Sequence, residues 1–411
     1  MNSASPRVFA QRCIWFFLAV LLAQFFHLNV IASATIEHNM VWLCVALGGV
    51  GLMALILRNI NVATAWPEIN SELFLLLFLA SFFVVVVFSR APYIYSFINH
   101  GLYLTREGGE VGNGGWYSLI TVIFYPLCIV LAFVEISRKK YYVLVAMMWC
   151  VVLLDFFILG TRNAPTFVLL FHLLTSRVKF FSPKMIVFVV GSITLFVLLF
   201  DWQSKARSLD TVTVGWSWSE TLRYSWLMEH LSIKEENIRF FDENLSLVMP
   251  AVFLLQYISH SIAVFSDLIS AGQYDAFGWQ AYLYDQYAIV GGGRDYTSEL
   301  IQNINPDAGL YQTLYSSLLF DFGWIGVFLM IVVLMVAYGF FDARRATISP
   351  ISIYLLMVLS TSSIENYLYN GLGLWRFLVF LLMVSLLSRV PKKMFETLVH
   401  NRRLGCQGSM E

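Results

Sequence analysis

Residues 73–89 read LFLLLFLASFFVVVVFS and contain no charged side chain. A helix that crosses a membrane needs about 20 mostly apolar residues, because the hydrocarbon core is about 30 Å thick. The run lacks the alternation of apolar and polar residues that a β-strand would show. Inside lipid, a helix is then the structure that satisfies its own backbone hydrogen bonds. The run therefore predicts a transmembrane helix.

Nine other apolar runs resemble it, so that we expect an all-α polytopic membrane protein with about ten transmembrane helices. Apolar residues make up 59% of the 411-residue chain and charged residues 13%. Soluble domains contain about 45–50% and about 25%, respectively. This composition excludes an ordinary soluble enzyme, a disordered chain and a nucleic-acid-binding protein. The other nine predicted spans are 13–33, 41–57, 117–135, 141–159, 163–180, 185–201, 314–341, 351–364 and 372–388.

The positions of the basic residues predict the orientation. Lys and Arg accumulate in cytoplasmic connections, and with a cytoplasmic N-terminus sixteen of the 26 fall on the inner side. Short, strongly basic connections such as 138–140 and 177–184 all lie inside in this arrangement. Arg7, Arg12 and the small residues 32–34 also resemble a cleavable signal peptide, but the length of the apolar run favours a retained first span.

The connections divide the chain into three parts: 1–201 with seven spans, a large periplasmic loop at 202–311, and 312–411 with the last spans and a cytoplasmic tail. From 202 to 308 the loop contains thirteen acidic and six basic residues, and it is rich in Trp and Tyr. This aromatic content argues against disorder and favours short amphipathic helices at the membrane interface. Within the loop, 246–269 is apolar, and we interpret it as a helix hairpin broken near Pro250 that does not cross the membrane.

Several ionisable residues are predicted at the outer ends of spans, where buried charges usually mark a polar cavity. Mutual ion pairing between helices is the alternative explanation. The residues are Asp155, Arg162, Asp201, Asp321, Glu365 and Arg376.

The segment 159–165 joins two apolar runs through a tight outer turn. Thr161 or Asn163 can cap the following helix, and Pro165 suits its first turn. Free N–H groups at that helix start attract an anion, and Arg162 adds the planar guanidinium that suits phosphate. Arg162 could instead extend to the lipid headgroups.

Two glycine-containing segments are further candidates. Arg294 follows three glycines, and such a loop can surround an anion with backbone amides or form an ordinary turn. Glycines and Asp321 interrupt the beginning of the run 314–341, and irregular backbone at that depth is tolerated where it lines a cavity. The chain lacks the spacing of a P-loop.

Histidines give no metal-binding pattern, since no H-E-x-x-H sequence occurs among the seven. His260 differs from the others because it lies in the apolar part of the outer loop. It could accept a proton there or simply pack at the interface.

Together these features resemble the bacterial oligosaccharide repeat-unit polymerases, the Wzy-type O-antigen polymerases. The layout matches, with about ten spans and one large periplasmic loop. The matching stretches are Arg106–Gly109 with Gly112–Gly114, Gly160–Asn163, Tyr257–Ile262, and Gly309–Tyr311 with Asp321–Gly326.

The resemblance implies a metal-independent, inverting glycosyltransferase of the GT-C type without a cofactor, at the periplasmic face of the inner membrane. It would transfer a glycan from one undecaprenyl-pyrophosphate carrier to another lipid-linked repeat unit. Membrane lipids and a chain-length regulator of the polysaccharide co-polymerase type are further expected partners.

The chemistry assigns roles to particular residues. The pyrophosphate leaving group needs fixed positive charge, which Arg162 can supply together with Arg294, Arg106 or Arg376. The acceptor hydroxyl needs a base; His260 is the first choice, and Asp321 or Glu365 the second. A lipid-linked oligosaccharide flippase and an O-antigen ligase are the alternatives.

Overall fold

A computed structural model of the chain describes the helices that carry most of the predicted spans. The described residues are 4–60, 65–91, 94, 95, 98, 115–155, 163–176, 182, 183, 187, 191, 194, 219, 222, 228, 231–244, 248–272, 313–319, 322–324, 328, 332, 347–364, 367, 368 and 373–389. Nearly all of the predicted span 185–201 and most of 314–341 and of the loop 202–311 lie outside them.

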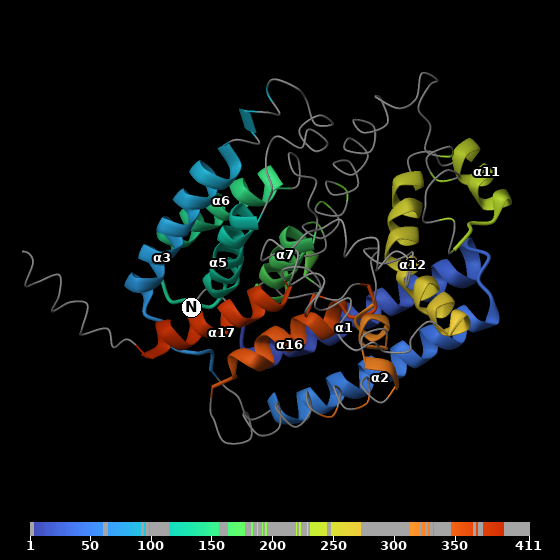
Figure 1. Cartoon of the computed structure of the whole chain (residues 1–411), viewed down its shortest axis with the longest axis horizontal. Helices are drawn as coiled ribbons and strands as arrows, with labels where there is room; N and C mark the ends of the chain where they lie inside the picture. Colours follow the sequence, from blue (N-terminus) through green and yellow to red (C-terminus); the bar gives the residue numbers. More distant parts are fainter. Residues whose placement is uncertain are drawn as a thin grey trace, which may run out of the picture.

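All regular elements of the described part are helices, and its isolated β-bridges join Ala32 to Ile233 and Ala65 to Thr347, in agreement with the expected fold class (Figure 1). Two helices end in π-helical turns, labelled η. The elements are α1 (Pro6–Phe26), η1 (His27–Ile31), α2 (Ile36–Ile60), α3 (Ser71–Val84), η2 (Val85–Arg90), α5 (Gly115–Leu131), α6 (Arg138–Leu154), α7 (Asn163–Thr175), α11 (Glu235–Asn244), α12 (Met249–Ala271), α16 (Pro350–Thr361) and α17 (Gly373–Arg389).

Side-chain caps mark the beginnings of several helices. The Asn70 side chain accepts hydrogen bonds from the backbone of Glu72 and Leu73 at the start of α3. Ser349 caps α16 in the same way, and Pro350 occupies the first turn. Capping satisfies N–H groups that have no partner within the helix, which explains why these apolar helices begin where they do.

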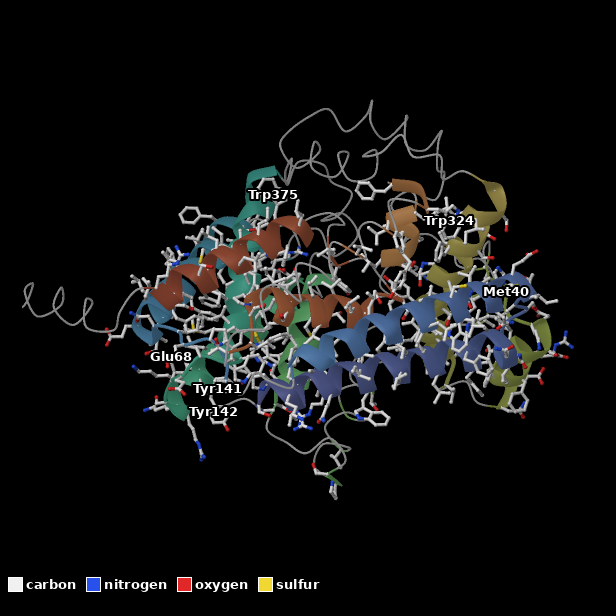
Figure 2. All side chains as sticks on the ribbon, turned by 90° about the horizontal axis from the view of Figure 1, so that it is seen from below. Met40, Glu68, Tyr141, Tyr142, Trp324 and Trp375 are labelled. Atoms are coloured by element: carbon white, nitrogen blue, oxygen red, sulfur yellow. The ribbon has the colours of Figure 1, made fainter. Side chains whose placement is uncertain are left out.

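Four helices are long and apolar enough to cross a membrane: Pro6–Ile31, Ile36–Ala54, Ser71–Arg90 and Met249–Ala271. The first three coincide with predicted spans. Large apolar side chains remain exposed on them, such as Met40 on α2 (Figure 2). Exposed apolar surface of this kind suits contact with lipid, so the structure agrees with a membrane-embedded helical protein.

The prediction of a helix hairpin at 246–269 is wrong, because α12 is one continuous helix with Pro250 in its first turn. Proline is tolerated there since the first N–H groups of a helix have no intrahelical partner. Met249 at its start packs with Ile31, and Asp267 near its end interacts electrostatically with His38. Both ends of α12 therefore lie by the same end of the α1–α2 pair, so that α12 crosses the pair instead of running along it (Figure 1).

The opposite end of the pair contacts segments that are predicted to be cytoplasmic or to lie at the cytoplasmic ends of spans. Backbone and side-chain hydrogen bonds join Ala4 N to Thr175 O, Trp66 Nε1 to Ala4 O, Ile348 N to Ala65 O and Asn70 N to Leu387 O. At the predicted outer end, Lys234 N donates to Ile31 O and Ser33 N to Ser232 O. This grouping agrees with the alternating directions expected for the helices concerned.

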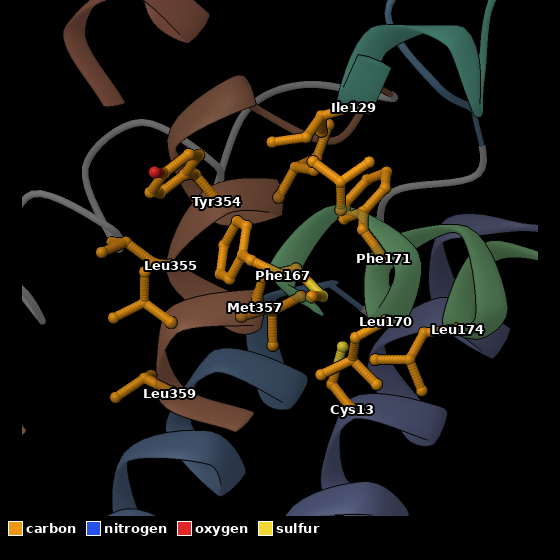
Figure 3. Close-up of a cluster of buried hydrophobic side chains, with 14 of the residues drawn as sticks. Cys13, Ile129, Phe167, Leu170, Phe171, Leu174, Tyr354, Leu355, Met357 and Leu359 are labelled. Atoms are coloured by element: carbon orange, nitrogen blue, oxygen red, sulfur yellow. The ribbon is translucent and has the colours of Figure 1, made fainter. Parts of the chain in front are cut away.

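The core lies where α1, α5, α7, α16 and α17 meet. Phe167 of α7 points toward Tyr354 of α16 with ring centroids 5.4 Å apart (Figure 3). Phe9 of α1 packs on Phe171, also on α7. These contacts join helices that are distant in sequence. α17 packs directly against α5, and the charged residues described next meet there.

Candidate functional site

Of the seven residues to which the sequence assigned a role in the reaction, His260 on α12 and Arg376 on α17 lie in the described part of the chain. α7 is described from Asn163, with Pro165 near its beginning, in agreement with the helix predicted after the glycine turn; the turn itself lies outside the described residues. The other five predicted site residues lie outside the described residues: Arg106, Arg162, Arg294, Asp321 and Glu365.

A buried ion pair joins η2 to the end of α6. Arg90 is the last residue of η2, and Asp155 directly follows α6. Arg90 Nε lies 2.5 Å from Asp155 Oδ1, and Arg90 Nη2 lies 2.8 Å from Oδ2. The two parallel bonds fix the orientation of both groups. The side chains are only 8% and 2% exposed, so loss of either partner would leave a buried charge unpaired.

Tyr125 of α5 extends this pair toward α17. Its side chain is buried, and its hydroxyl donates a hydrogen bond to Asp155 Oδ2. Asp155 thus accepts from Tyr125 on α5 and from Arg90 on η2. A phenol hydroxyl in an apolar interior needs such a partner, and this bond fixes the direction in which the ring points.

Arg376 lies over one face of the Tyr125 ring, with Cζ 5.6 Å from the ring centroid. Its Nε is buried and has no hydrogen-bond partner in the described residues. Within the same residues, no carboxylate forms an ion pair with it. We call Arg90, Tyr125, Asp155 and Arg376 the charged cluster.

The charged cluster contains two guanidinium groups and one carboxylate, so its described members carry one excess positive charge. Since Asp155 already binds Arg90 through both oxygens, the excess resides on Arg376. A planar guanidinium matches the geometry of phosphate oxygens. The arrangement is therefore suited to binding an anion beside the start of α17.

Sequence reasoning identified Asp155 and Arg376 but missed their partners. Arg90 directly follows the apolar run 73–89, so the criterion that selected Asp155 could have found it. Tyr125 had no such signal, because a tyrosine within an apolar run is indistinguishable in sequence from a packing residue.

His260 belongs to a second group of polar side chains, which joins α12 to α1 and to the end of α16. Gln24 Nε2 donates to the backbone oxygens of Ile258, at 2.7 Å, and Ser363, at 3.0 Å. Ser261 Oγ donates to the same Ser363 oxygen at 2.9 Å. We call Gln24, His27, His260, Ser261 and Ser363 the polar seam.

The His260 side chain is 0% exposed. Its Nδ1 lies 2.5 Å from the backbone oxygen of Tyr257. A carbonyl can only accept, so Nδ1 carries the proton and Nε2 is the basic atom of the neutral ring. The sequence placed His260 in the outer loop next to its substrate, but the structure encloses it between helices, so a substrate can reach Nε2 only if these helices separate.

His27 is a buried group that sequence reasoning counted but did not assign. It begins η1, one turn after Gln24, and is 0% exposed. Neither ring nitrogen has a hydrogen-bond partner in the described residues. A neutral imidazole tolerates such a position better than a charged one.

The described residues contain no group of three or more His, Cys, Asp or Glu that could hold a metal ion. No family model matches the chain, and no curated protein or solved structure is detectably similar to it. The charged cluster and the polar seam are therefore the basis on which a function can be proposed.

Proposed function

We propose that the chain polymerises undecaprenyl-pyrophosphate-linked oligosaccharide repeat units by glycosyl transfer at the periplasmic face of the bacterial inner membrane. The observation that carries the proposal is the position of Arg376. Its guanidinium lies over Tyr125 with Nε buried and without a hydrogen-bond partner in the described residues. Charged groups at membrane depth are costly, and they usually serve a function.

The leaving group explains why this charge is useful. When the bond between the sugar and the carrier breaks, negative charge develops on the pyrophosphate. A fixed cation in a site of low dielectric stabilises that charge more strongly than water would. Arg376 supplies this charge in the proposal, and Arg162, Arg294 and Arg106 remain further candidates from the sequence.

The second requirement is a base for the acceptor. In an inverting transfer, the acceptor hydroxyl attacks the anomeric carbon as the pyrophosphate leaves, and its proton must pass to a base. We assign this proton to Nε2 of His260, because Nδ1 is engaged by Tyr257. α12 must then move away from its neighbours when the acceptor binds. Asp321 and Glu365 are the alternatives for this role.

The hydrogen bonds of the polar seam are the contacts that a movement of α12 would have to break. Gln24 and Ser261 both hold the backbone at Ser363, two residues before Glu365 in the sequence. α12, which carries His260, is thus bonded directly to the segment that follows α16. A chain-length regulator and membrane lipids remain the proposed partners of this reaction.

The test is reconstitution of the purified full-length protein in liposomes with lipid-linked repeat units from a gene-deletion strain. Chain growth that Arg376→Gln abolishes supports the polymerase. Transfer of labelled units across the bilayer without chain growth would show a flippase instead. Transfer of glycan to lipid A-core without elongation would show a ligase.

A further inference from the structure

The Tyr125 ring connects the buried ion pair with Arg376. Its hydroxyl end is bound to Asp155, while one face of the ring lies under the guanidinium. Asp155 in turn is held by the two-bond fork from Arg90. The position of Arg376 therefore depends on residues from α5, η2 and the end of α6.

A Tyr125 side chain that could swing about its Cα–Cβ bond would leave the Arg376 guanidinium without a defined aromatic surface. A hydrogen bond from the hydroxyl restricts that swing and keeps the ring beside α17, and Asp155 can accept it reliably because Arg90 fixes both carboxylate oxygens. A guanidinium within about 6 Å of a ring centroid is attracted to the face of the ring. The same contact leaves the hydrogen-bonding edge of the guanidinium available, because stacking does not use its N–H groups.

The other surroundings of Arg376 are also aromatic. Tyr354 and Tyr367 lie within electrostatic range of its guanidinium, together with Tyr125 and Asp155. Tyr354 is buried in the core against Phe377 and Phe380 of α17. Tyr125 is the one among the described tyrosines near Arg376 that is also bound directly to the ion pair.

We infer that Tyr125 is a positioning residue for a pyrophosphate site at Arg376, with Asp155 and Arg90 holding the tyrosine ring in place. The inference rests on the proposed function for the identity of the natural anion, a lipid pyrophosphate. The site itself is defined by the geometry of the charged cluster. It should therefore also bind the pyrophosphate group of a carrier with a shorter isoprenoid chain, which can be tested in detergent.

Farnesyl pyrophosphate is a suitable probe, because it carries the same anion on a shorter isoprenoid. Its affinity for the purified full-length protein is measured beside that of farnesol and of inorganic pyrophosphate. Tyr125→Leu should weaken binding of farnesyl pyrophosphate about five- to thirtyfold, the range of a partly desolvated cation–π contact, and leave farnesol unaffected. Tyr125→Phe keeps the ring but loses the bond to Asp155, so its loss should be smaller.

Tyr315→Phe is the matched control. Tyr315 is also buried, and its hydroxyl accepts a hydrogen bond from Ser362 at 3.4 Å. Removing this hydroxyl should leave the affinity for farnesyl pyrophosphate unchanged. An equal loss in Tyr315→Phe and Tyr125→Phe would overturn the inference, because any buried tyrosine would then have the same effect.

A double-mutant cycle separates positioning from a general loss of structure. Tyr125→Leu should have no further effect on affinity when Arg376 is already replaced by Gln, since the tyrosine acts through the arginine. Additive losses would contradict the inference. Unfolded variants are recognised by their gel-filtration profile, and Tyr125→Phe, which keeps the volume of the ring, then carries the test.

The outcomes distinguish this inference from the proposed function. Coupled loss of binding in a protein that does not elongate glycans supports the anion site and refutes the polymerase. Chain growth that survives in Tyr125→Leu with unchanged affinity supports the polymerase and refutes the positioning role. Equal binding of phosphatidylglycerol vesicles and farnesyl pyrophosphate, abolished by Arg376→Gln, would identify a lipid headgroup site and overturn the assignment to pyrophosphate.

Discussion

The side-chain amide of Gln24 donates to the backbone oxygen of Ser363 at 3.0 Å, although the two residues are 339 positions apart in the chain. The same amide nitrogen donates to Ile258 of α12. One buried side chain on α1 thus holds two segments of the polar seam. The bonds link the N-terminal helices to the region that carries His260.

Gln24→Leu keeps the approximate volume of the side chain but removes both bonds. We expect the free energy of unfolding to fall by about 1–3 kcal/mol, because buried carbonyl groups lose a donor. Thermal unfolding in detergent measures the change. Asn29 lies on the adjoining turn but is exposed, and Asn29→Ala should change stability by less than about 0.5 kcal/mol. Equal effects of the two variants would contradict the role of Gln24.

Arg12 of α1 caps the end of α7 from outside that helix. Its Nη1 donates to the backbone oxygen of Leu174 at 3.1 Å and also to that of Ser176. Arg12→Met should lower the free energy of unfolding by about 1.5–3 kcal/mol, the usual value for hydrogen bonds from a charged group. Arg7→Met removes an exposed charge from the same helix and should have little effect. A stable Arg12→Met protein would show that the α7 end needs no cap.

Helix positions could be predicted well because crossing a bilayer requires apolar residues in uninterrupted runs. α2, for example, covers the predicted span 41–57 and extends beyond it at both ends. Boundaries were less accurate, since caps such as Asn70 depend on local backbone geometry. The prediction of a hairpin at 246–269 was wrong for a specific reason. Pro250 was interpreted as a break within the helix, but it lies in the first turn of α12.

The candidate site was less predictable, because its residues come together only through packing. Arg90 and Asp155 are 65 positions apart, and no feature of either apolar run specifies the other as partner. Asp155 and Arg376 were found by a rule about charges at span ends. That rule identifies costly residues but cannot tell a residue engaged in an ion pair from one that is available to a ligand.

The ion pair itself leads to a third prediction. Asp155→Ala leaves the buried guanidinium of Arg90 without its partner and should lower stability by about 3–5 kcal/mol. The double variant Arg90→Met, Asp155→Leu removes both charges and should recover most of this loss. Thermal unfolding in detergent compares the stability of the single and the double variant. If the single and double variants are equally unstable, the loss comes from packing and not from an unpaired charge.

His260→Gln tests the assignment of the base. Gln retains hydrogen-bonding capacity but cannot take the proton, so the rate of chain growth should fall by about 10²–10⁴ at normal expression. Ser259→Ala changes the neighbouring buried residue of α12 and should keep the wild-type rate. Normal elongation by His260→Gln would move the search for the base to Asp321 or Glu365.

The most direct measurement of the central claim is the mass of the lipid-linked products formed by the purified protein from a single defined repeat unit. Each transfer should add one whole repeat unit to a carrier and release one undecaprenyl pyrophosphate. We predict a ladder of such masses for the wild type and only the starting unit for Arg376→Gln. Starting units that keep their original mass with the wild-type protein would contradict the account.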